Sequence, residues 1–302
     1  MNWFERLSGW AVKRLPPNQL AEVRNAYLGL RRRSAPLVRA IRGTFDADAL
    51  RRHLEAEIGR DFEILMVHCS VNHMNPAYTE GPLELLRMLT AYCADDRTLA
   101  MPVFYFGDPE QGGVGQEFSR NPRFDLRRTP SQMGLLSEMF RRSKGVLSSR
   151  HPVMRVSARG PLAREITTGH ERAPLPCGTG SPFDHMARRN TLILGIGKPF
   201  EVLTQVHHAE DLLGDEFPVP TGPAGEPLAM ELIDGAEVVP FHLRARGLTW
   251  RRDMGLLRQL MPAGQLRSWS FHGVPLFAVR AAQVTDALIS AARQGRTIYV
   301  PV

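Results

Sequence analysis

Hydrophobic and polar positions alternate along residues 44–302 between a strand-like and a helix-like pattern. Three short apolar runs bounded by polar residues predict buried strands, at 64–67, 98–106 and 191–196. Apolar residues at helical spacing predict helices at 44–58, 83–89, 133–142 and 281–293. Shorter strand-like pieces follow after residue 217, at 237–239 and 269–271. This alternation predicts an α/β layered fold, with residues 107–130 as a long surface loop rich in Gly, Pro, Asp and Arg.

The first 43 residues form a basic arm that differs from the rest of the chain. Two amphipathic helices are predicted in it, the second ending near Arg33. The arm holds nine Lys or Arg and two Glu, so it carries the whole net charge of +7 and residues 44–302 are formally neutral. Aromatic residues with a basic flank are typical of a helix on an anionic membrane surface. Packing on the body, or on a second subunit in a homodimer, is the alternative. The arm has no nucleic-acid-reading module, so no nucleic acid partner is expected.

Composition favours a soluble globular protein, with 43% hydrophobic and 23% charged residues among 302. No apolar run approaches the roughly 18 residues that cross a bilayer, and charged residues interrupt the N-terminal apolar positions. The three cysteines lie far apart, as reduced thiols do. We therefore expect a cytoplasmic protein, peripheral at the inner membrane surface if the arm binds lipid. Its domains are the arm, 1–43, and one domain over 44–302.

The residues from Thr204 to Asp211 form the sharpest cluster of polar chemistry. On a helix, Thr204, His207 and Asp211 align at i, i+3 and i+7. A histidine beside a carboxylate is suited to accept a proton near neutral pH, although a structural histidine at a helix start has the same pattern. A metal site is not expected, because the adjacent histidines His207 and His208 point about 100° apart on a helix.

Two further clusters carry weaker signals. Residues 148–152 combine two serines, Arg150 and His151 before a proline, and Cys69 and Ser70 end the first core strand. Ligands gather at such strand ends in α/β proteins. The glycine-rich segments at 112–115 and 195–197 lack the remaining residues of a phosphate loop or a dinucleotide fingerprint, so neither indicates ATP or NAD.

Taken in order, these clusters resemble the aminoglycoside 3-N-acetyltransferase family. The likeness runs from about Phe45 to the C-terminus and is strongest over 63–217. The segments that carry it are Val67-His68-Cys69-Ser70, Met101-Pro102, Thr129-Pro130-Ser131-Gln132-Met133-Gly134, Ser149-Arg150-His151-Pro152, and Thr204, His207, Ala209 and Glu210.

The resemblance implies a mixed sheet flanked by helices, acetyl-CoA as donor, and direct transfer to an amine without an acyl-enzyme. It implies that His207 is the general base and Glu210 its orienting carboxylate. Thr204 and Asp211 are expected to bind the acceptor. The residues expected to bind acetyl-CoA are Ser70, Cys69, Thr129, Met133, Gly134, Arg150 and His151.

The chain also departs from the family pattern. The usual Arg-Ser-x-His-Pro order is Ser148-Ser149-Arg150-His151-Pro152 here, and Cys69 replaces a serine. A polycationic aminoglycoside calls for an acidic cleft, whereas residues 44–302 are neutral. An amino sugar on a nucleotide or lipid carrier is therefore an alternative acceptor. A non-catalytic relative that binds a ligand or partner is the alternative to an enzyme.

Overall fold

The computed structural model describes residues 29, 33–108, 110, 112–222, 226–244 and 247–301. Its centre is a seven-stranded mixed sheet with the strand order β10-β11-β6-β1-β2-β5-β4. These strands are β1 (Ile64–Cys69), β2 (Thr98–Pro102), β4 (Leu147–Ser148), β5 (Val156–Arg159), β6 (Thr191–Ile196), β10 (Arg267–Phe271) and β11 (Val274–Arg280).

The three central strands β6, β1 and β2 are parallel to one another. They are buried along their whole length, which is why they appear in the sequence as continuous apolar runs. Their carboxyl ends meet at one edge, which we call the carboxyl edge: Ser70 follows β1, Val103 follows β2 and Gly197 follows β6. The remaining strands join the sheet antiparallel to their neighbours.

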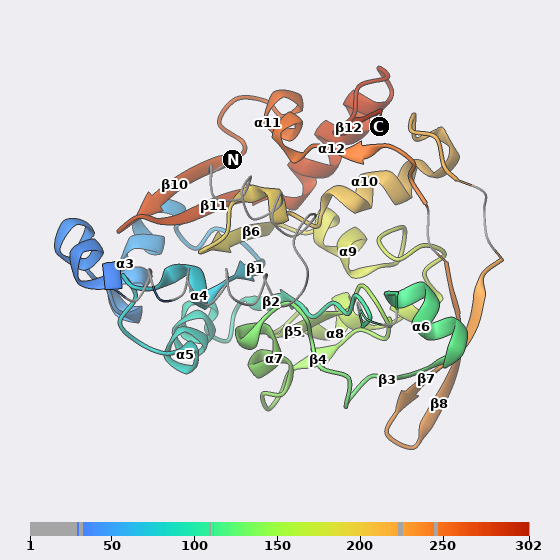
Figure 1. Cartoon of the computed structure of the whole chain (residues 1–302), viewed down its shortest axis with the longest axis horizontal. Helices are drawn as coiled ribbons and strands as arrows, with labels where there is room; N and C mark the ends of the chain where they lie inside the picture. Colours follow the sequence, from blue (N-terminus) through green and yellow to red (C-terminus); the bar gives the residue numbers. More distant parts are fainter. Residues whose placement is uncertain are drawn as a thin grey trace.

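Helices cover both faces of this sheet, as Figure 1 shows. On one face, α3 (Ala47–Ile58), α5 (Pro82–Cys93) and α7 (Leu135–Arg141) share a hydrophobic core with side chains such as Leu65 and Val67. The opposite core contains Ile64 and Met66 and is covered by α8 (Ala163–Thr167), α9 (Pro182–Arg188), α10 (Val206–Leu213) and α12 (Ala281–Ala292). The shorter helices are α4 (Val71–Met74), α6 (Val114–Arg120) and α11 (Leu257–Leu260). The predicted layered α/β fold is confirmed.

A second, three-stranded sheet stands at the lower right of Figure 1. Its strands are β3 (Arg123–Asp125), β7 (Leu228–Asp234) and β8 (Glu237–Leu243). Phe118 of α6 and Phe124 of β3 bury their rings in its core. The prediction of an unstructured loop over 107–130 was therefore wrong. The apolar partners that fold this segment come from β7 and β8, about a hundred residues later in the chain.

One predicted helix and one predicted strand have different bounds in the structure, at a glycine and at a proline. The helix predicted from Met133 begins at Leu135, because Gly134 has φ +108° and stands at its N-cap. The strand predicted over 98–106 ends at Pro102. Beyond it, the N–H groups of Val103 and Tyr105 still donate to carbonyls of the segment before β5, without regular strand geometry.

The last structured segments return to α10. The short strand β9 (Arg251–Arg252) pairs antiparallel with β12 (Tyr299–Val300), so that Arg252 lies opposite Tyr299. Figure 1 shows β12 above α10, beside α12.

Most of the basic arm lies outside the described residues, and so do its first predicted helix and its proposed lipid-facing residues. Residues 33–42 are helical, whereas the pattern predicted a helix end near Arg33. Arg39 donates to the carbonyl of Pro76 (2.9 Å), and the carbonyl of Arg42 contacts His272 Nδ1 (2.6 Å). The end of the arm therefore packs on the body. No helix of the described residues is long and apolar enough to cross a membrane.

Candidate active site

His207 lies near the start of α10, on the side of the helix that faces away from the core. Val206, Ala209 and Leu213 bury the other side against the sheet, at helical spacing. The helix ends at Gly214, which has φ +52°. This amphipathic pattern leaves the His207 side chain 26% exposed, so its imidazole is reachable by a ligand.

A chain of polar contacts surrounds the His207 ring. His207 Nδ1 lies 2.8 Å from Glu210 Oε2, three residues along the same helix. The Tyr299 hydroxyl donates to Glu210 Oε1 (2.7 Å) and accepts from Arg252 Nε (3.0 Å). Arg252 Nη1 lies 3.1 Å from His207 Nε2. Three elements far apart in sequence, α10, β9 and β12, therefore meet at one imidazole.

The contact with Glu210 orients the ring. A carboxylate only accepts, so His207 Nδ1 donates to Glu210 Oε2. The Arg252 guanidinium lies across both ring nitrogens, with Nη1 3.1 Å from Nε2 and Nη2 3.3 Å from Nδ1. Burial raises the pKa of Glu210, but its contacts with His207, Arg252 and Tyr299 outweigh burial and lower the pKa below its ordinary value. A carboxylate therefore orients the imidazole and stabilises its charged form, which is the arrangement of a general base.

The neighbours of His207 on this segment have structural contacts. Asp211 Oδ2 accepts from the backbone N–H of Cys177 (2.8 Å), and His208 Nδ1 lies 2.5 Å from the carbonyl of Cys177. Burial lowers the pKa of His208. Thr204 precedes α10, and its carbonyl accepts from the N–H of His207. The Thr204 hydroxyl is buried with no protein partner among the described residues, so its donor and acceptor capacity is unused.

Ser70 and Cys69 lie at the carboxyl end of β1. Ser70 is half-buried and donates its N–H to the carbonyl of Ile196, at the end of β6. Cys69 instead packs in the core shared with α3 and α5, on the face opposite α10. Burial raises its thiol pKa to about 12.

The loop from Thr129 to Gly134 lies at the end of β2. The N–H of Gln132 donates to the carbonyl of Phe104 (2.9 Å), and its side-chain oxygen accepts from the N–H of Phe106 (2.5 Å). Thr129 and Met133 are half-buried, whereas Gly134 is exposed. Phe106 and Leu135 beside the loop are 54% and 62% exposed. This edge therefore combines polar groups with uncovered apolar side chains.

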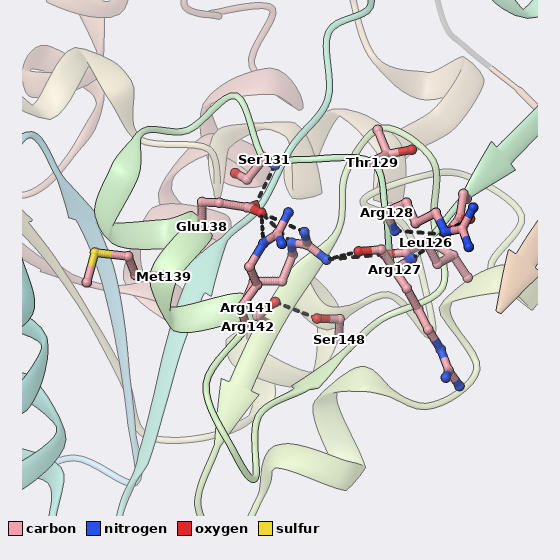
Figure 2. A network of polar contacts seen from close by, with 12 residues as sticks. Leu126, Arg127, Arg128, Thr129, Ser131, Glu138, Met139, Arg141, Arg142 and Ser148 are labelled. Atoms are coloured by element: carbon pink, nitrogen blue, oxygen red, sulfur yellow. Dashed lines mark hydrogen bonds and ion pairs between the residues drawn. The ribbon is translucent and has the colours of Figure 1, made fainter. Parts of the chain in front are cut away.

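Two charged groups, the half-buried Glu138 and the buried Arg155, fix the shape of this loop. Glu138 accepts from the N–H of Ser131 (2.8 Å) and pairs with both Arg141 (2.7 Å) and Arg142, as Figure 2 shows. Burial raises the pKa of Glu138, but these donors outweigh it and hold the value at about 2.

Arg155 holds the beginning of the same loop. It is fully buried and donates to the carbonyls of Leu126 (2.6 Å) and Thr129 (3.1 Å). Its guanidinium also lies 5.0 Å from the centre of the Phe124 ring. Burial lowers the pKa of Arg155 to about 10, so it stays charged at neutral pH.

Arg150 and His151 follow β4 and flank this loop. Arg150 pairs with Asp234 (3.0 Å) and Glu237, which tie it to the β7–β8 hairpin. His151 is buried and stacked on His170, with ring centres 4.7 Å apart, and its Nδ1 accepts from two backbone N–H groups. Burial, His170 and Arg155 hold the pKa of His151 well below its ordinary value, so the ring is neutral.

A cavity of 780 Å³ opens beside Arg150. Its lining includes the side chains of Arg127, Arg141, Arg142 and Arg164, but none of the residues in contact with the His207 ring. Among the described residues, no group of three His, Cys, Asp or Glu is arranged to hold a metal ion.

Comparison with known proteins places this chain in a family. The family model described as aminoglycoside 3-N-acetyltransferase matches residues 66–293, most of the chain. The chain belongs to the aminoglycoside 3-N-acetyltransferase family. Among curated members of this family, aminoglycoside N(3)-acetyltransferase VII of Streptomyces paromomycinus is 33% identical over 113 residues, which is 37% of this chain and 39% of that protein. Aminoglycoside N(3)-acetyltransferase III of Serratia marcescens is 27% identical over 159 residues, 50% of this chain and 58% of that protein.

Solved structures of the family share the fold. The aminoglycoside acetyltransferase AAC(3)-Xa has a TM-score of 0.68 at 20% identity, over 88% of this chain and 99% of that chain. AAC-IIIb, solved as a binary complex with CoASH, has a TM-score of 0.65 at 20% identity, over 85% of this chain and 100% of that chain. The aligned segments of the two curated relatives span less than two thirds of their length, 39% and 58%.

Within this acetyltransferase fold, the sequence pattern missed three residues of the site region: Tyr299, Arg252 and Arg155. Tyr299 and Arg252 lie 89 residues from Glu210 and 45 residues from His207, in strands of two residues each. Such short strands have no periodicity to detect. Arg155 is a single charge in an apolar run, and nothing in the sequence distinguishes it from an exposed arginine.

Proposed function

We propose that this protein transfers an acetyl group from acetyl-CoA to an amine of an amino sugar or aminoglycoside-like acceptor, with His207 as the general base. The observation that supports this most strongly is the contact between His207 Nδ1 and Glu210, because it leaves Nε2 as the proton acceptor. Family membership supports the reaction class, and the CoASH complex of the related AAC-IIIb supports the donor.

In this mechanism the acceptor attacks as the neutral amine, and His207 Nε2 takes one proton from its nitrogen as that nitrogen attacks the thioester carbonyl. A C–N bond forms and the C–S bond breaks, so the departing thiolate receives a proton and free CoA leaves. Glu210 stabilises the imidazolium between these two transfers. Thr204 is a candidate donor to the developing oxyanion, since its buried hydroxyl has no protein partner among the described residues.

The donor is proposed to lie along the carboxyl edge. The pantetheine arm is largely apolar with two amides, and the edge offers the half-buried Ser70, Thr129 and Met133 beside the exposed rim of Phe106 and Leu135. Arg150 and His151 are proposed to flank it, and Gly134 to let the loop pass close to the ligand. Cys69 is proposed to support the donor site indirectly, by packing in the core below Ser70. Asp211 positions the start of the acceptor site through its bond to Cys177.

Calorimetric titration with acetyl-CoA and with CoA tests the donor site. The wild-type protein, His207→Ala and the surface control His242→Ala are compared. We expect all three to bind with micromolar dissociation constants, because His207 acts in chemistry and not in donor affinity. In a thiol-release assay with amine acceptors, His207→Ala should lose about 100-fold or more of kcat, and His242→Ala should not. Absence of donor binding by the wild-type protein would instead support a non-catalytic relative.

A further inference from the structure

Arg252 covers the nitrogen of His207 that the proposed reaction uses. Its Nη1 lies 3.1 Å from His207 Nε2, and its Nη2 lies 3.3 Å from Nδ1. A guanidinium has no acceptor and does not lose its proton at physiological pH. The lone pair that would receive the acceptor's proton is therefore already engaged by a donor.

The fold fixes the position of the Arg252 side chain. Pairing of β9 with β12 sets it opposite Tyr299, whose hydroxyl accepts from Arg252 Nε (3.0 Å) and whose ring centre lies 5.4 Å from the guanidinium carbon. Arg252 Nε is also 3.9 Å from Glu210 Oε1. The side chain remains 35% exposed, so a ligand in solvent can reach it.

The charges around the ring decide which acceptor suits this arrangement. Glu210 from α10 and Arg252 from β9 contact the ring, and the Tyr299 hydroxyl of β12 bonds to both of them. Glu210 is 8% exposed and is shared by His207 and Tyr299. The more exposed of the two charges in contact with the ring is the Arg252 guanidinium, which repels an acceptor that carries only positive charge.

We propose that Arg252 determines the acceptor: it binds an oxyanion, a carboxylate or phosphate, on the same molecule as the reacting amine, and in doing so leaves His207 Nε2. The inference rests on the proposed acetyl transfer and names its substrate class, an anionic amine. A bidentate guanidinium–oxyanion pair is stronger than the contact with a neutral imidazole, which gives the side chain a reason to move. Binding of the correct acceptor then makes His207 Nε2 accessible to the acceptor's amine.

Three amines that differ in charge test the proposal in the thiol-release assay: glucosamine, glucosamine 6-phosphate and tobramycin. The variant is Arg252→Gln, and Arg251→Gln is the matched control, because it removes the same charge from the exposed neighbour on β9. We expect the wild-type kcat/KM for glucosamine 6-phosphate to exceed that for glucosamine by about tenfold or more. Arg252→Gln should abolish this preference and raise kcat/KM for tobramycin relative to that for glucosamine 6-phosphate. Arg251→Gln should keep the wild-type preference.

Acceptor preference separates this role from a purely structural one. A structural defect would lower kcat/KM for all three amines by one common factor, whereas loss of an anion-binding guanidinium lowers it selectively for glucosamine 6-phosphate. A wild-type enzyme that prefers tobramycin, with Arg252→Gln changing all acceptors by one common factor, would overturn the proposal.

A binding measurement tests the proposal even if none of the three amines is acetylated. Histidine ¹H–¹⁵N spectra are recorded as inorganic phosphate is added, with chloride at matched ionic strength as reference. Phosphate should shift the His207 Nε2 signal of the wild-type protein, because Arg252 leaves it, and should not shift that of Arg252→Gln. An unmoved wild-type signal overturns the role of Arg252. Failure of the acetyl-transfer proposal is recognised separately, as absence of both acetyl-CoA binding and thiol release.

Discussion

Replacing Glu210 by Gln is the sharpest test of the polar chain around His207. The substitution keeps the size of the side chain and removes its charge. In the present structure Glu210 accepts from His207 on one oxygen and from Tyr299 on the other. A glutamine accepts through one atom only, so its NH₂ group must face one of these two partners.

The expected loss in rate follows from the charge. Two unit charges 4 Å apart attract each other by about 4 kcal/mol at an effective dielectric constant of about 20. His207 is 26% exposed, so solvent screens part of this attraction and about 2 kcal/mol is a lower bound for the stabilisation of the imidazolium. We therefore expect kcat to fall between about 30-fold and about 1,000-fold in Glu210→Gln. The upper figure applies if the amide NH₂ faces Nδ1 and forces the ring proton onto Nε2.

The assay is thiol release at saturating acceptor and acetyl-CoA, with the thermal midpoint measured on the same samples. Glu216→Gln is the control, since it removes an exposed carboxylate three residues after α10. The control should match the wild-type protein in both measurements. If Glu210→Gln keeps kcat within about threefold while His207→Ala abolishes turnover, the carboxylate does not assist the base and the reasoning from its position is wrong.

Three further predictions use other parts of the molecule. Tyr299→Phe removes a donor to the buried Glu210, so we expect a loss of about 1.5–3 kcal/mol in urea unfolding and a lower kcat. The folded-state pKa of Glu138 is about 2, below the ordinary 4.5, so its stabilising effect is present above pH 4.5 and is lost as pH falls toward 2. Urea unfolding of Glu138→Gln should show a deficit of roughly 3 kcal/mol at pH 7 that shrinks over this window. A thiol reagent at pH 8 should label none of the buried cysteines of the native protein and all three after denaturation: Cys69, Cys93 and Cys177.

The sheet and its flanking helices could be predicted because their signals are local. The run 191–196 is a strand with those same bounds, and α12 ends one residue before its predicted end. Both elements bury apolar residues at the period of their own secondary structure. The prediction for residues 107–130 was wrong because the signal for their structure is not local. Phe118 and Phe124 are isolated apolar residues in a polar stretch, and the strands that bury them lie far along the chain.

The candidate site divides in the same way. His207 and Glu210 are three residues apart on one helix, so the sequence predicts their contact directly. Thr129 and Gly134 belong to one contiguous motif, but the place of this motif beside the end of β2 depends on the tertiary contact between Gln132 and Phe104. The assistance that Glu138, Arg141 and Arg155 give to this loop depends on tertiary packing, and it was not predicted.

This division also separates what the family resemblance can predict from what it cannot. His207 and Glu210, the proposed base and its carboxylate, lie within one short motif, so a resemblance built from short motifs predicts the type of reaction. Arg252 of β9 contacts this imidazole and Tyr299 of β12 contacts Glu210, and both lie outside the short motifs that carry the resemblance. The neutral charge of residues 44–302 gave a general reason to question a polycationic acceptor. The guanidinium beside His207 Nε2 turns that reason into a local one, because in the proposed mechanism the acceptor's amine approaches this nitrogen and would meet a positive charge there.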